Sequence, residues 1–204
     1  MAALTANILI AEDDPLIASS LKMIFVTLGY QIRTAPNGLS AIAAFRSKIP
    51  DILISDLNMP DMSGYELLSI VTRRFPAIRT IAMSGAFGGT QIPEGVAADS
   101  YYQKGCGVPA LLKAIERAQS ASRAEAPPTI WMQRGKDEAS AKGHIILSCP
   151  DCFRTFSQPV PTTASTVLHT MCAHCEGTIQ FAVVPSLDPP SALLPHPSWL
   201  YGLN

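Results

Sequence analysis

Two features that direct a chain to a membrane are missing from this sequence. No apolar run approaches the roughly 18–20 residues that a membrane span needs, and the first residues lack the basic start and long apolar core of a signal peptide. The chain also has no marked excess of charge of either sign, because it contains 15 Lys and Arg and 16 Asp and Glu. We therefore expect a cytoplasmic protein, and the overall charge does not point to nucleic acid or to a membrane as a partner.

Cysteine is scarce in the first two thirds of the chain, where Cys106 stands alone. The other four cysteines lie between positions 149 and 175, and prolines concentrate after Ala126. In a reducing cytoplasm such cysteines favour metal binding or free thiols over disulfides. This asymmetry predicts a compact first module over 1–121, a linker over 122–143, a cysteine-built module over 144–184 and a proline-rich tail over 185–204.

Short apolar runs alternate with helix-like segments through the first module. Such runs predict strands where turn residues bound them, and apolar residues at three- and four-residue spacing predict helices. The expected strands are 7–11, 31–35, 51–56, 79–84 and 100–103, and the expected helices follow Pro15 and Gly38, cover 65–75 and cover 108–118. The glycine-rich crossover 85–99 predicts only a short or irregular helix. This alternation predicts an α/β fold with a parallel sheet.

Polar side chains gather at the ends of these expected strands. Asp13 and Asp14 follow the first strand, Asp56 ends the third, Ser84 ends the fourth and Lys104 follows the fifth. In a parallel sheet all five meet at one edge, where ligands bind. Neighbouring carboxylates repel one another, and a hard cation such as Mg²⁺ together with a lysine relieves that repulsion. With a hydroxyl nearby, such an edge can hold a phosphoryl group.

These motifs resemble the receiver domain of two-component response regulators. The likeness covers residues 6–121 and rests on the following segments: Glu12-Asp13-Asp14, Asp56-Leu57-Asn58-Met59-Pro60 with Gly64, Ser84-Gly85 and Lys104. It implies a flavodoxin-like, doubly wound, five-stranded parallel sheet. It also implies a phosphoprotein of phosphorelay signal transduction. Any catalysis would be limited to autophosphorylation from phosphodonors and to autodephosphorylation.

The resemblance also implies a role for each matching residue. Asp56 would be the phosphoacceptor, taking the phosphoryl group from a sensor histidine kinase. Ser84 and Lys104 would bind the phosphoryl oxygens, and Tyr101 would be the switch residue that turns inward. The ligands of Mg²⁺ would be Asp13, Asp14, Asp56 and the backbone carbonyl of Asn58.

Two features depart from the family's pattern. The family usually has proline after the lysine, whereas here Gly105 follows Lys104 and leaves this lysine less constrained. The weak crossover at 85–99 alters a face through which receivers often signal and form homodimers. Two alternatives stay open: a receiver that has lost phosphotransfer, and a Tyr101 that serves only in packing.

The second module carries two Cys-x-x-Cys pairs: Cys149 with Cys152, and Cys172 with Cys175. Paired knuckles of this kind predict a tetrahedral zinc site that replaces a core in a short, β-rich zinc ribbon. The expected strands are 144–148, 166–171 and 178–184. Four thiolates leave zinc no open position, so the site is expected to be structural. Two disulfides and a rubredoxin-type iron site are the alternatives.

The charge around the zinc ribbon argues against nucleic acid. From residue 122 onward five basic residues face six acidic ones, which gives poor affinity for phosphate. A protein partner is the better expectation, with Phe153 and Phe156 as surface candidates and Trp131 as a residue that docks onto one of the modules.

The sequence thus predicts a response regulator whose output passes through the ribbon. A transcriptional regulator, a redox or metal sensor and an inert appendage remain the alternatives.

Overall fold

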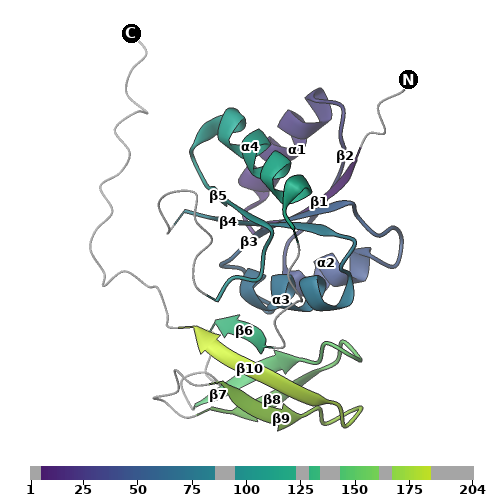
Figure 1. Cartoon of the computed structure of the whole chain (residues 1–204), viewed down its shortest axis with the longest axis vertical. Coiled ribbons are helices and arrows are strands. Elements are labelled where there is room, and N and C mark those ends of the chain that lie inside the picture. The colour runs from purple at the N-terminus through teal and green to yellow at the C-terminus, as the bar shows by residue number, and fades with distance from the viewer. Residues whose placement is uncertain (1–5, 86–94, 123–128, 134–142, 161–166, 185–204) are drawn as a thin grey trace, which may run out of the picture.

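A computed structural model describes residues 6–85, 95–122, 129–133, 143–160 and 167–184. An N-terminal α/β unit lies above a C-terminal β unit in Figure 1. The strands of the N-terminal unit are β1 (Asn7–Ala11), β2 (Gln31–Ala35), β3 (Ile52–Asp56), β4 (Arg79–Ser84) and β5 (Ser100–Gln103). Its described helices are α1 (Pro15–Thr27), α2 (Gly38–Ala44), α3 (Gly64–Arg74) and α4 (Gly107–Ser120). The predicted alternation of strands and helices is confirmed.

The five strands form a parallel sheet in the order β2-β1-β3-β4-β5. Helices α1 and α4 cover one face of the sheet, and α2 and α3 cover the other (Figure 1). The predicted flavodoxin-like fold is therefore confirmed. The strand order reverses between β1 and β3, and the carboxyl ends of strands at such a switch point frame a ligand site.

The first helix begins and ends where its sequence predicts. Asp14 caps α1, because its Oδ1 accepts hydrogen bonds from the backbone N–H groups of Leu16 at 2.8 Å and Ile17 at 3.2 Å. Pro15 occupies the first turn, where its missing N–H costs nothing. Gly29 follows the helix with φ of +90°, a conformation that glycine adopts readily.

Two small sheets make up the C-terminal unit. Its strands are β6 (Thr129–Gln133), β7 (His144–Ser148), β8 (Thr155–Pro159), β9 (Leu168–Met171) and β10 (Thr178–Val184). One sheet has the order β6-β10-β9, and β7 and β8 form an antiparallel pair. The expected strands at 144–148 and 178–184 are present, the third begins at Leu168, and β8 was not predicted.

Strand β6 corrects the expectation of a linker over 122–143. It pairs in parallel with β10, and Ile130 and Met132 are buried. A five-residue strand whose partner lies about fifty positions later leaves little local periodicity in the sequence. The expected docking of Trp131 is present: its backbone N–H donates to Ser69 Oγ at 3.1 Å, and its ring lies against Gly95.

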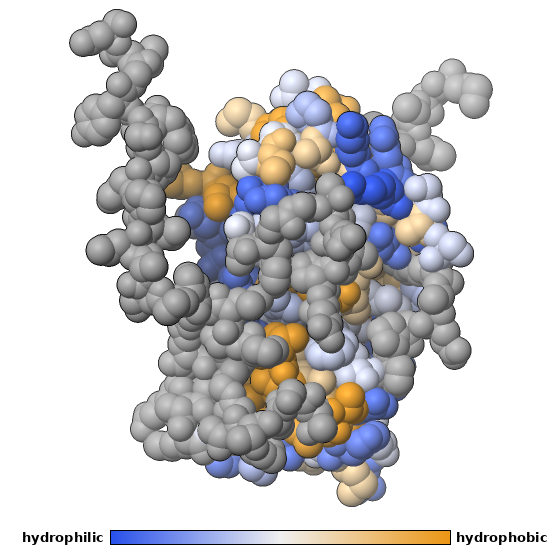
Figure 2. Space-filling view, turned by 60° about the vertical axis from the view of Figure 1, so that its left-hand side comes forward, coloured by the Kyte–Doolittle hydropathy of each residue, from blue (hydrophilic) through white to orange (hydrophobic). Residues whose placement is uncertain are grey.

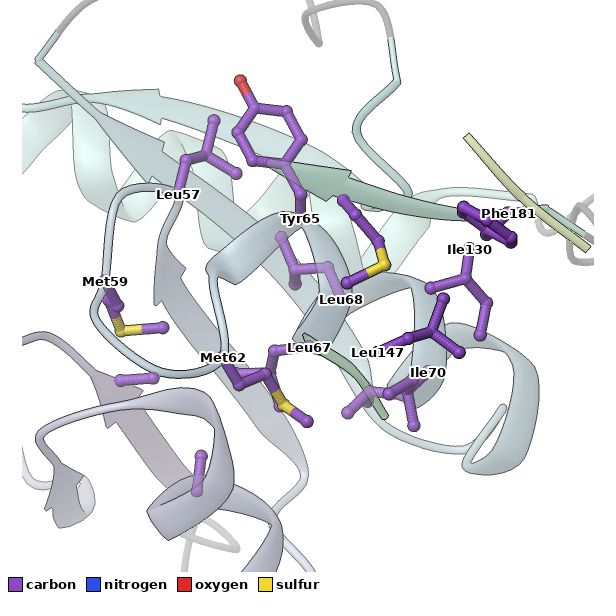
Figure 3. Packing of buried hydrophobic residues seen from close by; sticks show 14 of the residues in the cluster. Leu57, Met59, Met62, Tyr65, Leu67, Leu68, Ile70, Ile130, Leu147 and Phe181 are labelled. Carbon is purple, nitrogen blue, oxygen red and sulfur yellow. The ribbon is translucent and has the colours of Figure 1, made fainter. Parts of the chain in front are cut away.

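Helix α3 lies between the large sheet and the C-terminal unit. Its residues from Gly64 to Val71 are all buried, which is typical of a helix covered on both sides. Ile130 and Leu147 of the C-terminal unit belong to the same apolar cluster as Leu68 and Ile70 of α3, as Figure 3 shows. The two units therefore share one continuous core.

One sequence expectation falls outside the described residues. The irregular crossover predicted over 85–99 lies mostly in 86–94, which the structure does not describe. Within the described part of the chain, no helix combines the length and the apolar character that crossing a membrane requires.

Candidate functional site

The carboxyl edge of the sheet gathers the polar residues that the sequence predicted there. Asp56 is the last residue of β3 and Ser84 the last of β4. Lys104 follows β5, and its backbone N–H donates to the carbonyl oxygen of Ser84 at 2.9 Å. The backbone N–H of Glu12, just past β1, donates to the carbonyl of Ala35 at 2.9 Å. Parallel pairing therefore fixes all of these side chains at one edge.

Lys104 joins two acidic side chains at this edge. Its Nζ lies 2.8 Å from Asp56 Oδ2, and it lies 3.0 Å and 2.8 Å from the two carboxylate oxygens of Glu12. The side chain of Lys104 is only 22% exposed, so these contacts are partly shielded from solvent. The sequence suggested that Gly105 leaves this lysine less constrained, yet both acids bind it directly.

The acidic cluster differs by one position from the predicted one. Carboxylate oxygens of Glu12, Asp13 and Asp56 lie within 4.8 Å of one another. Asp14 was predicted as a metal ligand, but its carboxylate caps α1 instead. The sequence analysis missed Glu12 as a candidate ligand. The Asp14-Pro15 pair, a helix-start signal, could have shown that Asp14 was already engaged.

Burial sets the protonation behaviour of this cluster. It raises the pKa of Asp56 above its ordinary value, and the hydrogen bond from Lys104 partly opposes that rise. Burial likewise raises the pKa of Glu12, with the same opposition from Lys104. For Lys104 burial alone would lower the pKa, but its hydrogen bonds to Asp56 and Glu12 raise it overall. A cation of higher charge would stabilise the ionised carboxylates further.

The three carboxylates at the carboxyl edge of the sheet are chemically suitable ligands for Mg²⁺. Magnesium takes oxygen ligands, tolerates one or two carboxylates and retains several waters. Asn58, whose carbonyl was predicted as a further ligand, lies in the loop directly after Asp56 and directs its backbone N–H at the Asp56 carboxylate. The residues present therefore fit the metal that the resemblance implies.

Ser84 and Tyr101 meet beside this edge. Both residues are buried, and the Tyr101 hydroxyl donates to the Ser84 carbonyl oxygen at 3.1 Å. The aromatic side chain predicted as the switch thus points inward. Its ring belongs to the apolar cluster that continues through α3 into the C-terminal unit.

Gly64 sets the distance between β3, which ends at Asp56, and α3. Its backbone N–H donates to the Leu57 carbonyl at 3.0 Å. A Cβ at this position would overlap the carbonyl oxygen of Asp56. Glycine thus allows the first turn of α3 to lie directly against the end of β3.

The two cysteine knuckles have the same backbone geometry. In each one the N–H four positions after the first cysteine donates to the carbonyl of that cysteine, from Phe153 to Cys149 at 2.9 Å and from Glu176 to Cys172 at 3.0 Å. Both donors have positive φ, 58° and 60°. An N–H two positions after each first cysteine, of Asp151 and His174, also points at its sulfur at 3.4 Å. The knuckles are therefore two copies of one turn.

The four sulfurs are spaced as metal ligands. All four lie within 4.8 Å of one another, with 3.6 Å between Cys149 and Cys175 and 3.7 Å between Cys152 and Cys172. A zinc–sulfur bond of about 2.3 Å places tetrahedral sulfurs roughly 3.8 Å apart, whereas a disulfide needs about 2.05 Å. Burial raises the pKa of the Cys149 thiol, and a bound cation would favour its thiolate. His174 is not part of the cluster and contacts the Thr155 carbonyl instead.

Comparison with known proteins agrees with this geometry. Residues 8–116, just over half of the chain, match the family model of the response regulator receiver domain. Response regulator TrrA of Thermotoga maritima, solved with Mg²⁺ and BeF, is 29% identical with a TM-score of 0.51, over 56% of this chain and 99% of that one. A receiver domain of Methanospirillum hungatei is 27% identical with a TM-score of 0.51. The match covers 57% of this chain and 96% of that one.

Curated relatives match over the same region. The probable transcriptional regulatory protein TcrX of Mycobacterium tuberculosis is 34% identical over 78 residues, which are 38% of this chain and 33% of that protein. The DNA-binding transcriptional regulator NtrC of Salmonella typhimurium is 36% identical over 75 residues, which are 37% of this chain and 16% of that protein. The chain thus spans a third or less of the length of these relatives. Fold, site geometry and family model agree, and the chain belongs to the response regulator receiver family.

Proposed function

We propose that this chain accepts a phosphoryl group on Asp56 from a sensor histidine kinase in a Mg²⁺-dependent reaction. The observation that carries the proposal is the buried Asp56 carboxylate at a strand end, bonded to Lys104 and adjacent to two further acids. Burial shields this carboxylate from bulk water, and only one of its oxygens is bonded to the lysine. The carboxylate also accepts backbone N–H bonds from Leu57 and Asn58, and its oxygen that is not bonded to the lysine can act as the nucleophile.

The transfer step balances without a further reactant. An Asp56 carboxylate oxygen attacks phosphorus and forms a P–O bond, while the P–N bond to the donor histidine breaks. The leaving imidazole nitrogen keeps the electron pair and takes up a proton from solvent. Mg²⁺, when bound, neutralises charge that develops on the phosphoryl oxygens. Glu12 and Asp13 hold that cation, and Lys104 pairs with the transferred group, as Ser84 does with its hydroxyl.

Replacing Asp56 with asparagine is expected to abolish phosphorylation. Incubating the chain with a small acyl phosphate and Mg²⁺ should add one phosphoryl mass, and that gain should vanish in Asp56→Asn because the amide is not a nucleophile. Intact-mass spectrometry measures the outcome. Asp61→Asn is the matched control, because Asp61 is an exposed acid in the loop that follows β3 and asparagine tolerates its φ of 63°. Undiminished phosphorylation of Asp56→Asn would refute the assignment.

A second pair of variants separates Glu12 from Asp14 as the magnesium ligand. Glu12→Gln should weaken Mg²⁺ binding about tenfold or more, since it removes one of the clustered carboxylates. Asp14→Asn should leave the affinity nearly unchanged, because asparagine caps a helix as well as aspartate does. A Mg²⁺ titration of each protein measures both. If Asp14→Asn weakened Mg²⁺ binding more than Glu12→Gln did, Asp14 would be the ligand instead of Glu12.

We propose protein contacts of the C-terminal unit as the output. Ile146, Val167 and Met171 of that unit are 42%, 44% and 66% exposed. Hydrophobic residues also come to the surface on the lower part of the molecule in Figure 2. Of the two predicted surface aromatics, Phe153 stacks on Phe75 of the receiver, and Phe156 lies edge-on to His174. Aliphatic residues therefore replace them as the candidate contact surface.

Nucleic-acid binding is the second candidate function. Its support is that relatives such as NtrC are named as DNA-binding transcriptional regulators. Against it, Arg154 is the single Lys or Arg in the described residues 129–133, 143–160 and 167–184, which also hold Asp151 and Glu176. Phosphate contacts need clustered cations. Retention of the full chain on a duplex-DNA column at physiological salt would favour this second function.

A further inference from the structure

The first cysteine knuckle lies along α3 and contacts it at both ends of the helix. The backbone N–H of Ser148 donates to Glu66 Oε1 at 2.7 Å, at the first turn of α3. At the last turn Arg74 lies 3.3 Å from Asp151. Ser148 precedes the ligand Cys149, and Asp151 stands between the two ligands of that knuckle. The helix therefore contacts the knuckle at Asp151 and, through Ser148, the end of β7 that leads directly into it.

Aromatic and polar contacts extend this interface. The ring of Phe75, the residue after α3, stacks on Phe153 with centroids 6.2 Å apart and 23° between the ring planes. Glu66 is 2% exposed, so the loss of its contact with Ser148 would leave polar groups unpaired in the core. The exposed pair of Arg74 and Asp151 contributes little in comparison. The buried contact at Glu66 is thus the dominant polar link between the knuckle and the receiver.

The same end of α3 is fixed to the phosphoacceptor. Gly64, two positions before Glu66, has no room for a side chain because of the Asp56 carbonyl, and its N–H is bonded to the Leu57 carbonyl. Ser63 caps the helix, accepting from the Glu66 N–H at 3.4 Å. One rigid helical turn thus joins the strand end that carries Asp56 to the residue that holds the knuckle.

A bound metal would hold the knuckle in this shape. Four sulfurs at these separations cannot all be thiolates without a cation, because like charges repel strongly in a buried cluster. Without the cation, the turn from Ser148 to Phe153 loses the tetrahedral closure that aligns both of its contacts with α3. Metal binding and the docking of the knuckle on α3 are therefore parts of one equilibrium.

We infer that the four-cysteine site is a second input to the receiver, so that metal occupancy there and phosphoryl binding at Asp56 strengthen each other through the first turn of α3. The inference rests on the proposed phosphoacceptor function. The sign is positive because the docked knuckle and the inward Tyr101 occur together in this structure. Such linkage is reciprocal, since each ligand changes the affinity of the other by the same factor.

The test uses the full chain and Mg²⁺ with beryllium fluoride, a stand-in for the phosphoryl group. Calorimetry measures the affinity of this probe for the zinc-loaded and the chelated protein. Zinc is expected to tighten binding at least about fivefold, the lower end of typical coupling. Equal affinity in the two forms overturns the coupling alone. Absence of binding in both forms overturns the coupling together with the proposed phosphoacceptor function.

Two additions keep the test decisive if the chelated chain unfolds. The zinc affinity, measured by competition with a chromophoric chelator, should rise by the same factor when Mg²⁺ and beryllium fluoride are present, and an unchanged zinc affinity overturns the inference. Glu66→Ala keeps all four cysteines and all acids of the Asp56 site. In this variant zinc should change the affinity for beryllium fluoride by less than about twofold. Arg74→Gln breaks only an exposed ion pair and should keep the coupling. Full coupling in Glu66→Ala would exclude the α3 route.

Discussion

Replacing Cys172 with serine is expected to abolish tight zinc binding and to destabilise the C-terminal sheets. Cys172 is 2% exposed, and its sulfur lies 3.7 Å from that of Cys152. Serine does not ionise at neutral pH and is a poor ligand for zinc, so the tetrahedron stays open. Structural zinc contributes about 10–16 kcal/mol to the folding of isolated zinc-finger peptides. The loss here should be smaller, because the shared core with the receiver holds part of the unit in place.

Cys106→Ser is the matched control for this prediction. Cys106 precedes α4 at the N-cap position and is exposed, and its side chain makes no capping bond. Serine is a good cap, so this variant should be as stable as the parent chain or slightly more stable. Metal analysis and thermal unfolding of the purified proteins measure both effects. A Cys172→Ser chain with full zinc content and an unchanged unfolding temperature would contradict the assignment, and bound iron would favour the rubredoxin-type alternative.

The sequence predicts the receiver well because its signals are local. A short apolar run that ends in Asp56 marks both a buried strand and the edge at which the strand ends. Parallel pairing then brings Ser84 and Lys104 to the same edge without any further information. The cysteine knuckles are equally local, since each ligand pair lies within four residues. Both the sheet edge and the cysteine knuckles could therefore be predicted without knowing which distant residues they contact.

Prediction failed where one residue had two competing uses. Asp14 was assigned to the metal although Asp14-Pro15 is also a helix-start signal, and in the fold its carboxylate accepts two backbone N–H groups of α1. Glu12, directly after β1, lies in the cluster instead. The spacing of Ser63 and Glu66 fits a capping box, in which the glutamate would reach back to the N-cap N–H. In the fold Glu66 accepts from Ser148, 82 positions later, which local reasoning could not reveal.

Glu66→Gln is expected to stabilise the protein above neutral pH. Burial raises the pKa of Glu66 to about 7 from its ordinary 4.5, and the hydrogen bond from Ser148 only partly opposes this. The folded state therefore holds a proton that the unfolded state releases, and the free energy of unfolding falls as pH rises from about 4.5 to about 7. The difference of 2.5 units corresponds to on the order of 3 kcal/mol, fully lost above pH 7.

Glutamine separates this charge from the shape of the side chain. It stays neutral at every pH, and its amide oxygen can still accept from Ser148. With zinc saturating, the variant should exceed the parent in stability by up to about 3 kcal/mol at pH 8, and the gap should close toward pH 5. Urea unfolding across this range measures the difference, in which contributions from Asp56 and the cysteines cancel. Glu116→Gln, at an exposed position of α4, should change nothing. Parallel stability curves for Glu66→Gln and the parent chain would mean that Glu66 stays ionised at the interface, held by groups other than Ser148.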